Sequence, residues 1–300
     1  MSKKIFPDIA QLARGFDGLL LDAYGVFWGG NDFGLLPGSK EIMEELVAQG
    51  KIVGILSNST QLASKEIHKL YSHDLIQGKH FHFLMTSGEI ARHIFLHEKL
   101  PFAASTHQFW LFGGGHPKFA SHQAIFQGTL YQETQDLHAA DFIYIAVPHL
   151  KGIDQVDPTV FRTEIEKLKK ANLPMVCSNP DHFAHEGTPP QAVVRQGRIA
   201  MMYEEIGGEV YYIGKPHPKA YAMAMQQFHQ YNIINPQVIL MVGDTPETDV
   251  RGAHHFGMPA ALVTQTGIMA DRISRKGLTH ALAELPVQDY PDYLIERLGA

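Results

Sequence analysis

The chain of 300 residues contains a single cysteine, Cys177. One cysteine cannot form an intrachain disulfide, and it has no second thiol with which to build a metal or redox site, so we expect Cys177 to be a small interior residue. No run of eighteen apolar residues occurs, and we therefore expect no transmembrane helix. Lys3 and Lys4 are not followed by an apolar segment, so we expect no signal peptide and, by elimination, a cytoplasmic location.

The sequence also lacks an excess of positive charge. Its formal net charge is −6, so no broad basic field is available for nucleic acid or for an acidic membrane surface. The 18 histidines are scattered and the HExxH motif does not occur, which argues against a zinc site. The glycine-rich segment LFGGGHP at 111–117 lacks the common nucleotide-binding patterns, so we interpret it as a tight turn.

Short segments typical of strands alternate with amphipathic segments along the chain. The expected strands are 18–22, 51–57, 82–87, 108–113, 141–147, 173–178, 209–214, 237–244 and 260–264. Helical periodicity between them includes 37–50 and 158–172. This alternation, with nearly continuous apolar runs in the strands, is typical of parallel sheets covered by helices on both faces. The sequence therefore predicts an α/β fold built on a doubly wound, Rossmann-like parallel sheet.

Polar residues of a few kinds stand at or just after these strands. They are Asp22, Ser57, Lys215, Asp244 and Asp249. Each alone has a structural explanation, such as a helix cap or a turn. Ligands of open parallel sheets bind outside the carboxyl ends of the strands. The full set at several strand ends therefore indicates one shared site.

In this order the residues resemble the four motifs of the haloacid dehalogenase superfamily: a nucleophilic aspartate, a serine or threonine, a lysine and a paired acidic motif. The segments TSGE (86–89), NPD (179–181) and 203–218 further resemble the class IIA branch. That branch includes phosphatases of sugar phosphates, 4-nitrophenyl phosphate, pyridoxal phosphate and phosphoglycolate. The resemblance spans most of the chain and implies a hydrolase.

The resemblance implies phosphoryl transfer with magnesium as cofactor. Asp22 is the expected nucleophile and would form an aspartyl-phosphate. The expected magnesium ligands are the carboxylates of Asp22 and Asp244 and the backbone carbonyl of Tyr24. Asp249 is expected either to be a further ligand or to orient a metal-bound water. Lys215 would offset negative charge on Asp22 and on the phosphoryl group.

The phosphate cradle is expected at the second strand end. The hydroxyl of Ser57, with Asn58 and nearby N–H groups, would hold a phosphoryl oxygen. Asn179 and Asp181 follow the strand 173–178 and are expected to face the substrate, with an Asx-type turn as the equally plain alternative.

The spacing of the motifs predicts an inserted domain. The gap between Asp22 and Ser57 has room for a turn and a helix, whereas the segment from Ser57 to Lys215 is long enough to hold a second α/β domain. We expect a hydrolase core at 1–87 plus 207–300 and a cap domain at 88–206 that closes over the substrate.

Tyr24 departs from the pattern of the phosphatases, most of which have an aspartate two residues after the nucleophile. That aspartate protonates the leaving oxygen and then activates water, a contribution of about 10²–10⁴-fold in rate. The segment DAYG also resembles the first motif of 2-haloacid dehalogenases, which need neither metal nor this acid. The paired acidic motif and the short first gap oppose that alternative. His182, His185 and His217 are candidate proton donors, although ordinary surface histidines are the simpler interpretation.

The sequence therefore predicts a magnesium-dependent phosphate monoester hydrolase acting on a small phosphorylated metabolite. Two alternatives stay open at this point: a 2-haloacid dehalogenase, and a protein that binds a phosphorylated ligand without turnover. Neither a nucleic acid nor a membrane is expected as a partner, and the sequence does not indicate an oligomeric state.

Overall fold

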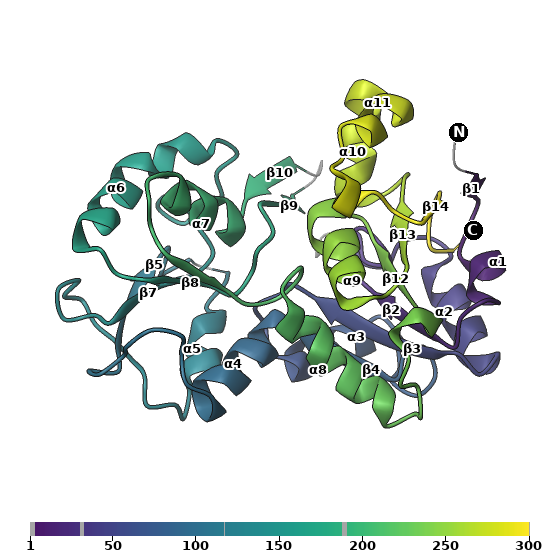
Figure 1. Cartoon of the computed structure of the whole chain (residues 1–300), viewed down its shortest axis with the longest axis horizontal. Coiled ribbons are helices and arrows are strands. Elements are labelled where there is room, and N and C mark those ends of the chain that lie inside the picture. Colours follow the sequence, from purple (N-terminus) through teal and green to yellow (C-terminus); the bar gives the residue numbers. More distant parts are fainter. Residues whose placement is uncertain (1–3, 31–32, 117, 188–190, 300) are drawn as a thin grey trace. The chain divides into compact units, whose positions relative to one another are not determined.

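Two sheets of parallel strands organise the chain (Figure 1). The computed structural model describes residues 4–30, 33–116, 118–187 and 191–299. The chain divides into two units. The first unit is Met1–Ser57, Ser64–Met85 and Lys215–Ala300, and the second unit is Asn58–Ala63 and Thr86–Gly214.

In the described part of the first unit, seven strands form a sheet in the order β1-β14-β13-β12-β2-β3-β4. The pairs from β1 to β3 are all parallel. The strands are β1 (Ile5–Phe6), β2 (Gly18–Leu21), β3 (Ile52–Ser57), β4 (Phe83–Thr86), β12 (Ile239–Gly243), β13 (Ala260–Val263) and β14 (Tyr293–Ile295).

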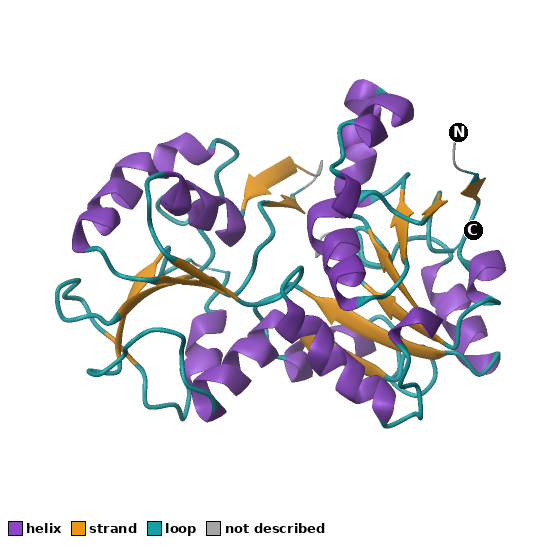
Figure 2. Ribbon diagram, in the orientation of Figure 1, coloured by secondary structure: helices purple, strands orange, loops and turns teal. Residues whose placement is uncertain are grey.

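Helices flank this sheet (purple in Figure 2). They are α1 (Ala10–Ala13), α2 (Ser39–Ala48), α3 (Ala63–Tyr71), α8 (Pro218–His229), α9 (Arg251–Phe256), α10 (Gly267–Lys276) and α11 (Leu278–Ala283), with short turns at η2 (Pro236–Val238), η3 (Pro246–Val250) and η4 (Val287–Asp289). The central strand β2 is buried at every position. Leu19 and Leu21 pack into one core cluster while Leu20, which is also buried, points to the opposite face. Side chains on both faces of β2 are therefore apolar, which fixes this strand between two layers of helices.

The order of the strands places a topological switch point at the centre of this sheet. From β2 the chain passes through α2 to β3 on one side, and from β12 it passes through α9 to β13 on the other side. The neighbours β2 and β12 are parallel, so their carboxyl ends meet at the same edge. Ligand sites of open α/β sheets lie at such a point.

The second unit has a parallel sheet of its own. Its described strands run in the order β11-β8-β7-β5-β6, and all four pairs are parallel. They are β5 (Gln108–Phe112), β6 (Gln132–Glu133), β7 (Phe142–Ile145), β8 (Met175–Cys177) and β11 (Val210–Tyr212). An antiparallel hairpin of β9 (Phe183–Glu186) and β10 (Gln191–Val194) lies apart from this sheet. The helices are α4 (Ser87–His97), α5 (Ser121–Phe126), α6 (Arg162–Ala171) and α7 (Gln196–Glu205), with a 3₁₀ turn η1 (Pro158–Phe161) before α6.

The predicted α/β fold with a parallel sheet is confirmed, and each of the nine expected strands contains a strand of the structure. Sequence reasoning missed the short strands β1, β6, β9, β10 and β14. Cys177 is buried, as expected.

One expectation needs correction. The strand 209–214 does not belong to the sheet that carries Asp22, because β11 pairs with β8 in the second sheet. The second unit accordingly includes 86–87 and 207–214, which lie outside the expected insertion at 88–206. Lys215 is therefore the residue at which the chain re-enters the first unit, and it does not follow a strand of the first sheet.

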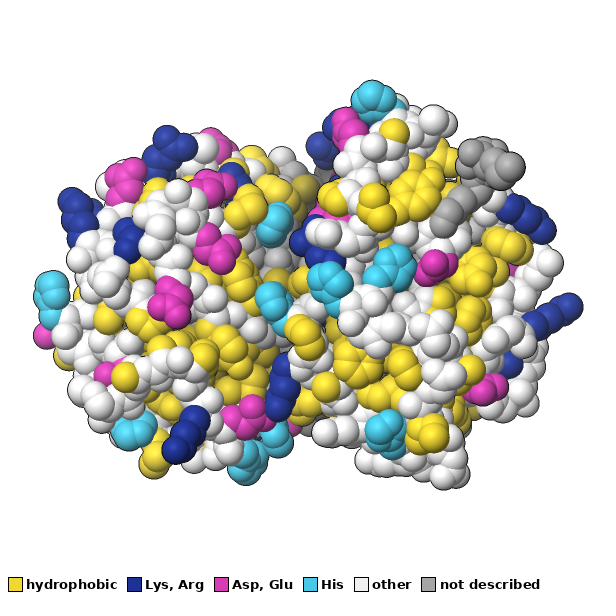
Figure 3. All heavy atoms as spheres, viewed as in Figure 1, with side chains coloured by type: hydrophobic (Ala, Val, Ile, Leu, Met, Phe, Trp, Pro, Cys, Tyr) yellow, Lys and Arg dark blue, Asp and Glu magenta, His cyan; other side chains and the backbone are white. Residues whose placement is uncertain are grey.

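Two surface findings bear on partners. Among the described helices, none combines the length and the apolar character needed to cross a bilayer. On the face drawn in Figure 3, lysine and arginine side chains stand singly or in small groups between acidic and uncharged ones.

An aromatic cluster holds the second sheet to the helices beneath it. The ring of Phe142, which is fully buried, lies 5.9 Å from that of Phe95 and 5.8 Å from that of Phe109 (centroid distances). We expect Phe142→Ala to lower the free energy of unfolding by about 3–5 kcal/mol, because the cavity it leaves cannot collapse fully. Urea denaturation followed by circular dichroism measures this loss. Leu130→Ala, at a side chain that is 73% exposed, should change it by less than about 0.5 kcal/mol; equal losses would contradict the packing argument.

Candidate active site

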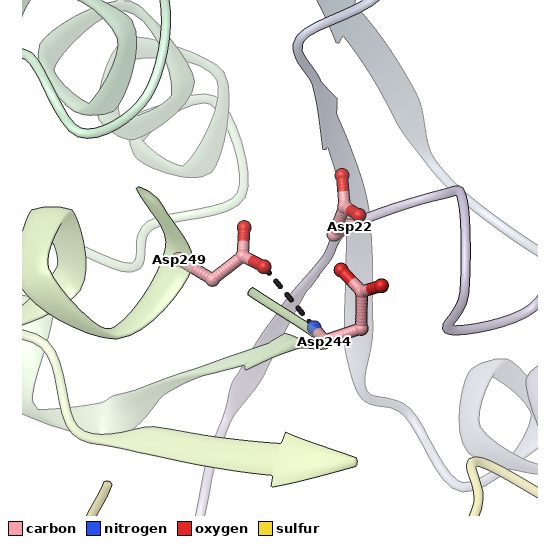
Figure 4. A group of neighbouring side chains, drawn as sticks. All are labelled: Asp22, Asp244 and Asp249. Carbon is pink, nitrogen blue, oxygen red and sulfur yellow. Dashed lines mark hydrogen bonds between the residues drawn. The ribbon is translucent and has the colours of Figure 1, made fainter. Parts of the chain in front are cut away.

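Two aspartates leave the central strands at the switch point. Asp22 follows β2 directly, and Asp244 follows β12 directly. The N–H of Asp22 donates to the carbonyl oxygen of Val242 at 2.9 Å, which extends the pairing of the two strands to this position. Both aspartates are buried. The pairing of β2 with β12 thus brings together two carboxylates that are far apart in sequence (Figure 4).

Lys215 joins Asp22 to a third carboxylate. Its Nζ donates to Oδ1 of Asp22 at 2.5 Å and to Oδ1 of Asp249 at 2.7 Å. The side chain of Lys215 is 2% exposed and that of Asp249 is 1% exposed. A buried ammonium with two carboxylate partners is held by short, charge-assisted hydrogen bonds, so Lys215 fixes the distance between Asp22 and Asp249.

A tight turn holds Asp249. The turn η3 follows β12, and Oδ2 of Asp249 accepts hydrogen bonds from the N–H groups of Asp244 (3.1 Å; dashed in Figure 4) and Thr245 (3.0 Å). The hydroxyl of Tyr221 in α8 donates toward the carbonyl oxygens of Thr248 and Asp249 at 3.1 and 3.0 Å. Both oxygens of the Asp249 carboxylate therefore accept hydrogen bonds from protein donors.

Asp244 sits between two glycines. Gly25 and Gly267 have φ values of +80° and +70°, and a Cβ atom at either position would collide with the Asp244 carboxylate. Its Oδ1 accepts the hydroxyl of Thr245 at 2.9 Å, and its Oδ2 accepts the N–H of Ile268 at 2.7 Å. Glycine is required here both for the left-handed backbone and for the close approach.

Negative charge predominates among the described residues that form this cluster. Burial, together with the negative charges of Asp22 and Asp249, raises the pKa of Asp244 well above its ordinary value. Ligand oxygens of the three aspartates all lie within 4.8 Å of one another. Three carboxylates face one lysine, and oxygen donors of this kind suit a hard divalent cation. The residues present therefore fit a divalent metal ion.

Ser57 ends β3, the neighbour of β2, and is buried. Because β2 and β3 are parallel, Ser57 emerges at the same edge of the sheet as Asp22. This is the position that the sequence pattern predicts for it.

Tyr24 forms a contact that the sequence did not suggest. Its hydroxyl accepts a hydrogen bond from Nζ of Lys69 in α3 at 3.1 Å, and the same ammonium forms an ion pair with Glu66. Nζ also lies 4.8 Å from the ring centroid of Trp28. Burial alone would lower the pKa of Lys69, but Tyr24 and Glu66 outweigh it and the pKa is raised. The only advance signal is the i,i+3 spacing of Glu66 and Lys69, which many surface helices share.

The remaining candidates lie in the second unit. Nδ2 of Asn58 donates to Oδ1 of Asp181 at 2.8 Å, so these two predicted residues do meet. Oδ1 of Asn179 accepts the N–H of Asp181 at 3.0 Å, which is the Asx turn that the sequence left as an alternative.

The three histidines considered as proton donors do not all belong to the same unit. His182 and His185 belong to the second unit, and His217 belongs to the first. Burial lowers the pKa of His217 to about 4. His217 is therefore neutral near pH 7 and is poorly suited to donate a proton.

Comparisons with known proteins agree with this geometry. A family model described as HAD-hydrolase-like matches residues 212–298, which include Lys215 and the paired acidic motif. Chronophin from Rattus norvegicus is 26% identical over 94% of this chain and 85% of its own length. Both sequence similarities agree with the resemblance of the motifs to the haloacid dehalogenase superfamily.

Solved structures of the superfamily share the fold over nearly the whole chain. A haloacid dehalogenase-like hydrolase from Brucella suis has a TM-score of 0.77 at 20% identity and covers 97% of this chain and 98% of its own. A possible sugar phosphatase from Cytophaga hutchinsonii has a TM-score of 0.73 at 20% identity and covers 99% and 98%. Sequence and fold comparisons thus support the resemblance drawn from the motifs, and with it a hydrolase.

The raised pKa of Asp244 gives a test of the electrostatics. Its ionisation opposes folding, so stability is lost as the pH rises from the ordinary aspartate range, about 3.9, through the folded pKa. We expect Asp244→Asn to raise the melting temperature at pH 7 in the presence of a chelator, and the gain to vanish below about pH 4. Differential scanning fluorimetry measures both. Asp74→Asn, at a side chain that is 82% exposed, should have no such effect; a pH-independent loss in Asp244→Asn would contradict the assignment.

Proposed function

We propose that this hydrolase cleaves phosphate monoesters of small metabolites, with magnesium as cofactor and Asp22 as nucleophile. The observation that carries the proposal is the buried ion-pair network in which Lys215 binds Asp22 and Asp249 beside Asp244. Phosphoryl transfer requires a fixed carboxylate and neutralisation of the charge on the transferring oxygens. This cluster supplies a carboxylate held by an ammonium at an edge of the sheet where ligands bind.

In the proposed reaction Asp22 attacks phosphorus and the bond to the ester oxygen breaks, leaving an aspartyl-phosphate. Water then attacks phosphorus and releases inorganic phosphate and the free carboxylate. Lys215 holds Asp22 in one orientation and stabilises its negative charge. Ser57 and Asn58 would donate hydrogen bonds to phosphoryl oxygens.

Magnesium would supply charge neutralisation at the phosphoryl oxygens. Asp22, Asp244 and the backbone carbonyl of Tyr24 would hold it. Because both oxygens of Asp249 accept protein hydrogen bonds, we assign Asp249 to orientation of Asp244, Lys215 and a metal-bound water.

The second unit would be the cap, and Asn179 and Asp181 would face the substrate from it. A sugar phosphate is one candidate substrate, since the neighbour from Cytophaga hutchinsonii is described as a possible sugar phosphatase. We also infer a cytoplasmic protein without nucleic-acid or membrane partners, from the composition and the net charge of −6.

Tyr24 limits the substrates in this account. Its hydroxyl is hydrogen-bonded to the Lys69 ammonium, and no carboxylate stands at position 24 to protonate the leaving oxygen. Esters with an acidic leaving group need little protonation. We therefore propose that such esters are turned over fastest and that hydrolysis of the aspartyl-phosphate is slow.

The first test is phosphate release from 4-nitrophenyl phosphate, pyridoxal phosphate and sugar phosphates, with magnesium or with chelator. Release should require magnesium and fall to the uncatalysed rate in Asp22→Asn, because the nucleophile is lost. Asp74→Asn, on the exposed surface, serves as the control and should keep full activity. Undiminished release in Asp22→Asn would refute the proposed nucleophile.

The second test restores an acid at position 24. Tyr24→Asp should raise the rate on alkyl phosphates by about 10²-fold and change the rate on 4-nitrophenyl phosphate much less, since only the former needs a proton. Tyr24→Asn is the matched control. Asparagine has nearly the same size as aspartate and also removes the contact with Lys69, but it offers no proton. Equal gains in both variants would show that the effect comes from lost bulk and not from acid catalysis.

Tyr24 is also the one feature that favours a 2-haloacid dehalogenase. Halide release from 2-chloropropionate distinguishes the two chemistries, because displacement at carbon needs no metal. The proposed function predicts no halide release with or without chelator. Halide release that needs no metal would contradict the proposed phosphatase and would favour a 2-haloacid dehalogenase.

A further inference from the structure

The second unit contains a pocket that the proposed reaction does not use. Its volume is about 600 Å³, and every residue that lines it belongs to the second unit. Pockets of about 300–1,000 Å³ are typical of sites for small molecules. The pocket therefore has the capacity for a ligand of its own.

The pocket lies at the switch point of the second sheet. From β5 the chain passes through α5 to β6 on one side, and from β7 it passes through α6 to β8 on the other. The lining comes from both crossovers, namely from the glycine-rich loop 113–115 after β5 and from His149 after β7. Gly113 has φ +69°, and a Cβ there would lie 2.8 Å from the carbonyl oxygen of Val147. Glycine thus lets the two crossovers approach at the place where parallel sheets bind ligands.

Aromatic side chains form the apolar part of the wall. Trp110, Phe112 and Phe161 line the pocket, and all three belong to or pack against one hydrophobic cluster of the second unit. Phe112 and Phe161 are 1% exposed, whereas Trp110 is only partly buried. Such a wall favours a planar, apolar or aromatic surface on the ligand.

Two buried imidazoles form the polar part of the wall. His116 and His122 line the pocket and are more than nine-tenths buried. Nδ1 of His122 has no hydrogen-bond partner among the described residues, whereas Nε2 of His116 lies 3.6 Å from Oδ1 of Asp154. Nδ1 of His116 accepts the N–H of Lys118 at 3.0 Å, so its Nε2 carries the proton in the neutral ring. Burial lowers the pKa of both histidines. A buried polar atom without a partner is costly, and a ligand that pairs with Nδ1 of His122 recovers that cost.

The charges of the lining select against anions. Glu133 and Glu164 are the charged residues among the described lining, which includes neither lysine nor arginine. His116 and His122 do not compensate, since burial favours their neutral form. A phosphate group would meet carboxylates here without a cation. The described residues that could hold a metal ion together are the three aspartates of the first unit, so a metal is not the expected occupant.

We propose that this pocket is a second ligand site, which takes a planar, nitrogen-bearing ring compound that is neutral or cationic. The ring would lie against Trp110, one of its nitrogens would pair with Nδ1 of His122, and a positive group would face Glu133 and Glu164. The proposal does not depend on the proposed function of the first unit.

Tryptamine, adenosine and inorganic phosphate are the probes for this site, each titrated into the full chain. The chain has two tryptophans, Trp28 and Trp110. Cationic tryptamine and neutral adenosine should both bind saturably in calorimetry. Adenosine should also change the fluorescence of Trp110, and this change should be lost in Trp110→Phe. Inorganic phosphate should not compete with either probe.

A double variant of the two glutamates then tests how much their charge contributes to ligand affinity. Glu133→Gln with Glu164→Gln should weaken tryptamine binding about tenfold and adenosine binding much less, because exposed ion pairs each contribute up to about 1 kcal/mol. Glu166→Gln, on the same helix as Glu164 and outside the lining, should leave both affinities unchanged. Failure of both organic probes to bind would overturn the proposal, and so would tryptamine affinity that is unchanged in the double variant or phosphate that displaces the probes. Asp22→Asn should bind both probes as the parent does, which separates this result from any failure of the proposed reaction.

Discussion

The buried ammonium of Lys215 is the interaction on which the active site depends. It lies between Asp22 and Asp249 with almost no access to solvent. Two carboxylates this close would repel each other in a medium of low dielectric, and removal of the single cation from such a site typically costs about 3–5 kcal/mol. Lys215 therefore connects the end of β2 to the turn η3 and places a positive charge beside Asp22, the proposed nucleophile.

The backbone around the cluster is shaped by the same requirement. Gly25 and Gly267 leave space for the Asp244 carboxylate, and Tyr221 holds the carbonyl end of the turn that presents Asp249. Hydrogen-bond donors of the protein thus orient each carboxylate before a ligand binds. Burial, together with the negative charges of Asp22 and Asp249, raises the pKa of Asp244. A site of this kind gains stability when a cation binds.

Much of this arrangement could be predicted from sequence because it follows from local patterns. Apolar runs locate the strands, and parallel strands bring the residues after them to one edge, so the meeting of Asp22 with Asp244 follows from β2 and β12 alone. The partner of β11 was not predictable, because strand pairing is non-local and 209–214 has the same apolar pattern as strands of the first sheet. The contact of Tyr24 with Lys69 depends on which face of α3 packs toward the loop after β2. The second pocket depends on the strand order of the second sheet, and the segment 111–117 alone indicates a turn.

The central claim is that Asp22 is the group that accepts the phosphoryl group. It is tested most directly by quenching the reaction with acid during turnover of 4-nitrophenyl phosphate and mapping the phosphorylated peptide by mass spectrometry. Since Tyr24 offers no carboxylate to activate water, the account predicts that phosphate accumulates on the peptide that contains Asp22 and that hydroxylamine removes it. Phosphate release without any phosphorylated peptide, or with phosphate on another residue, would contradict the account.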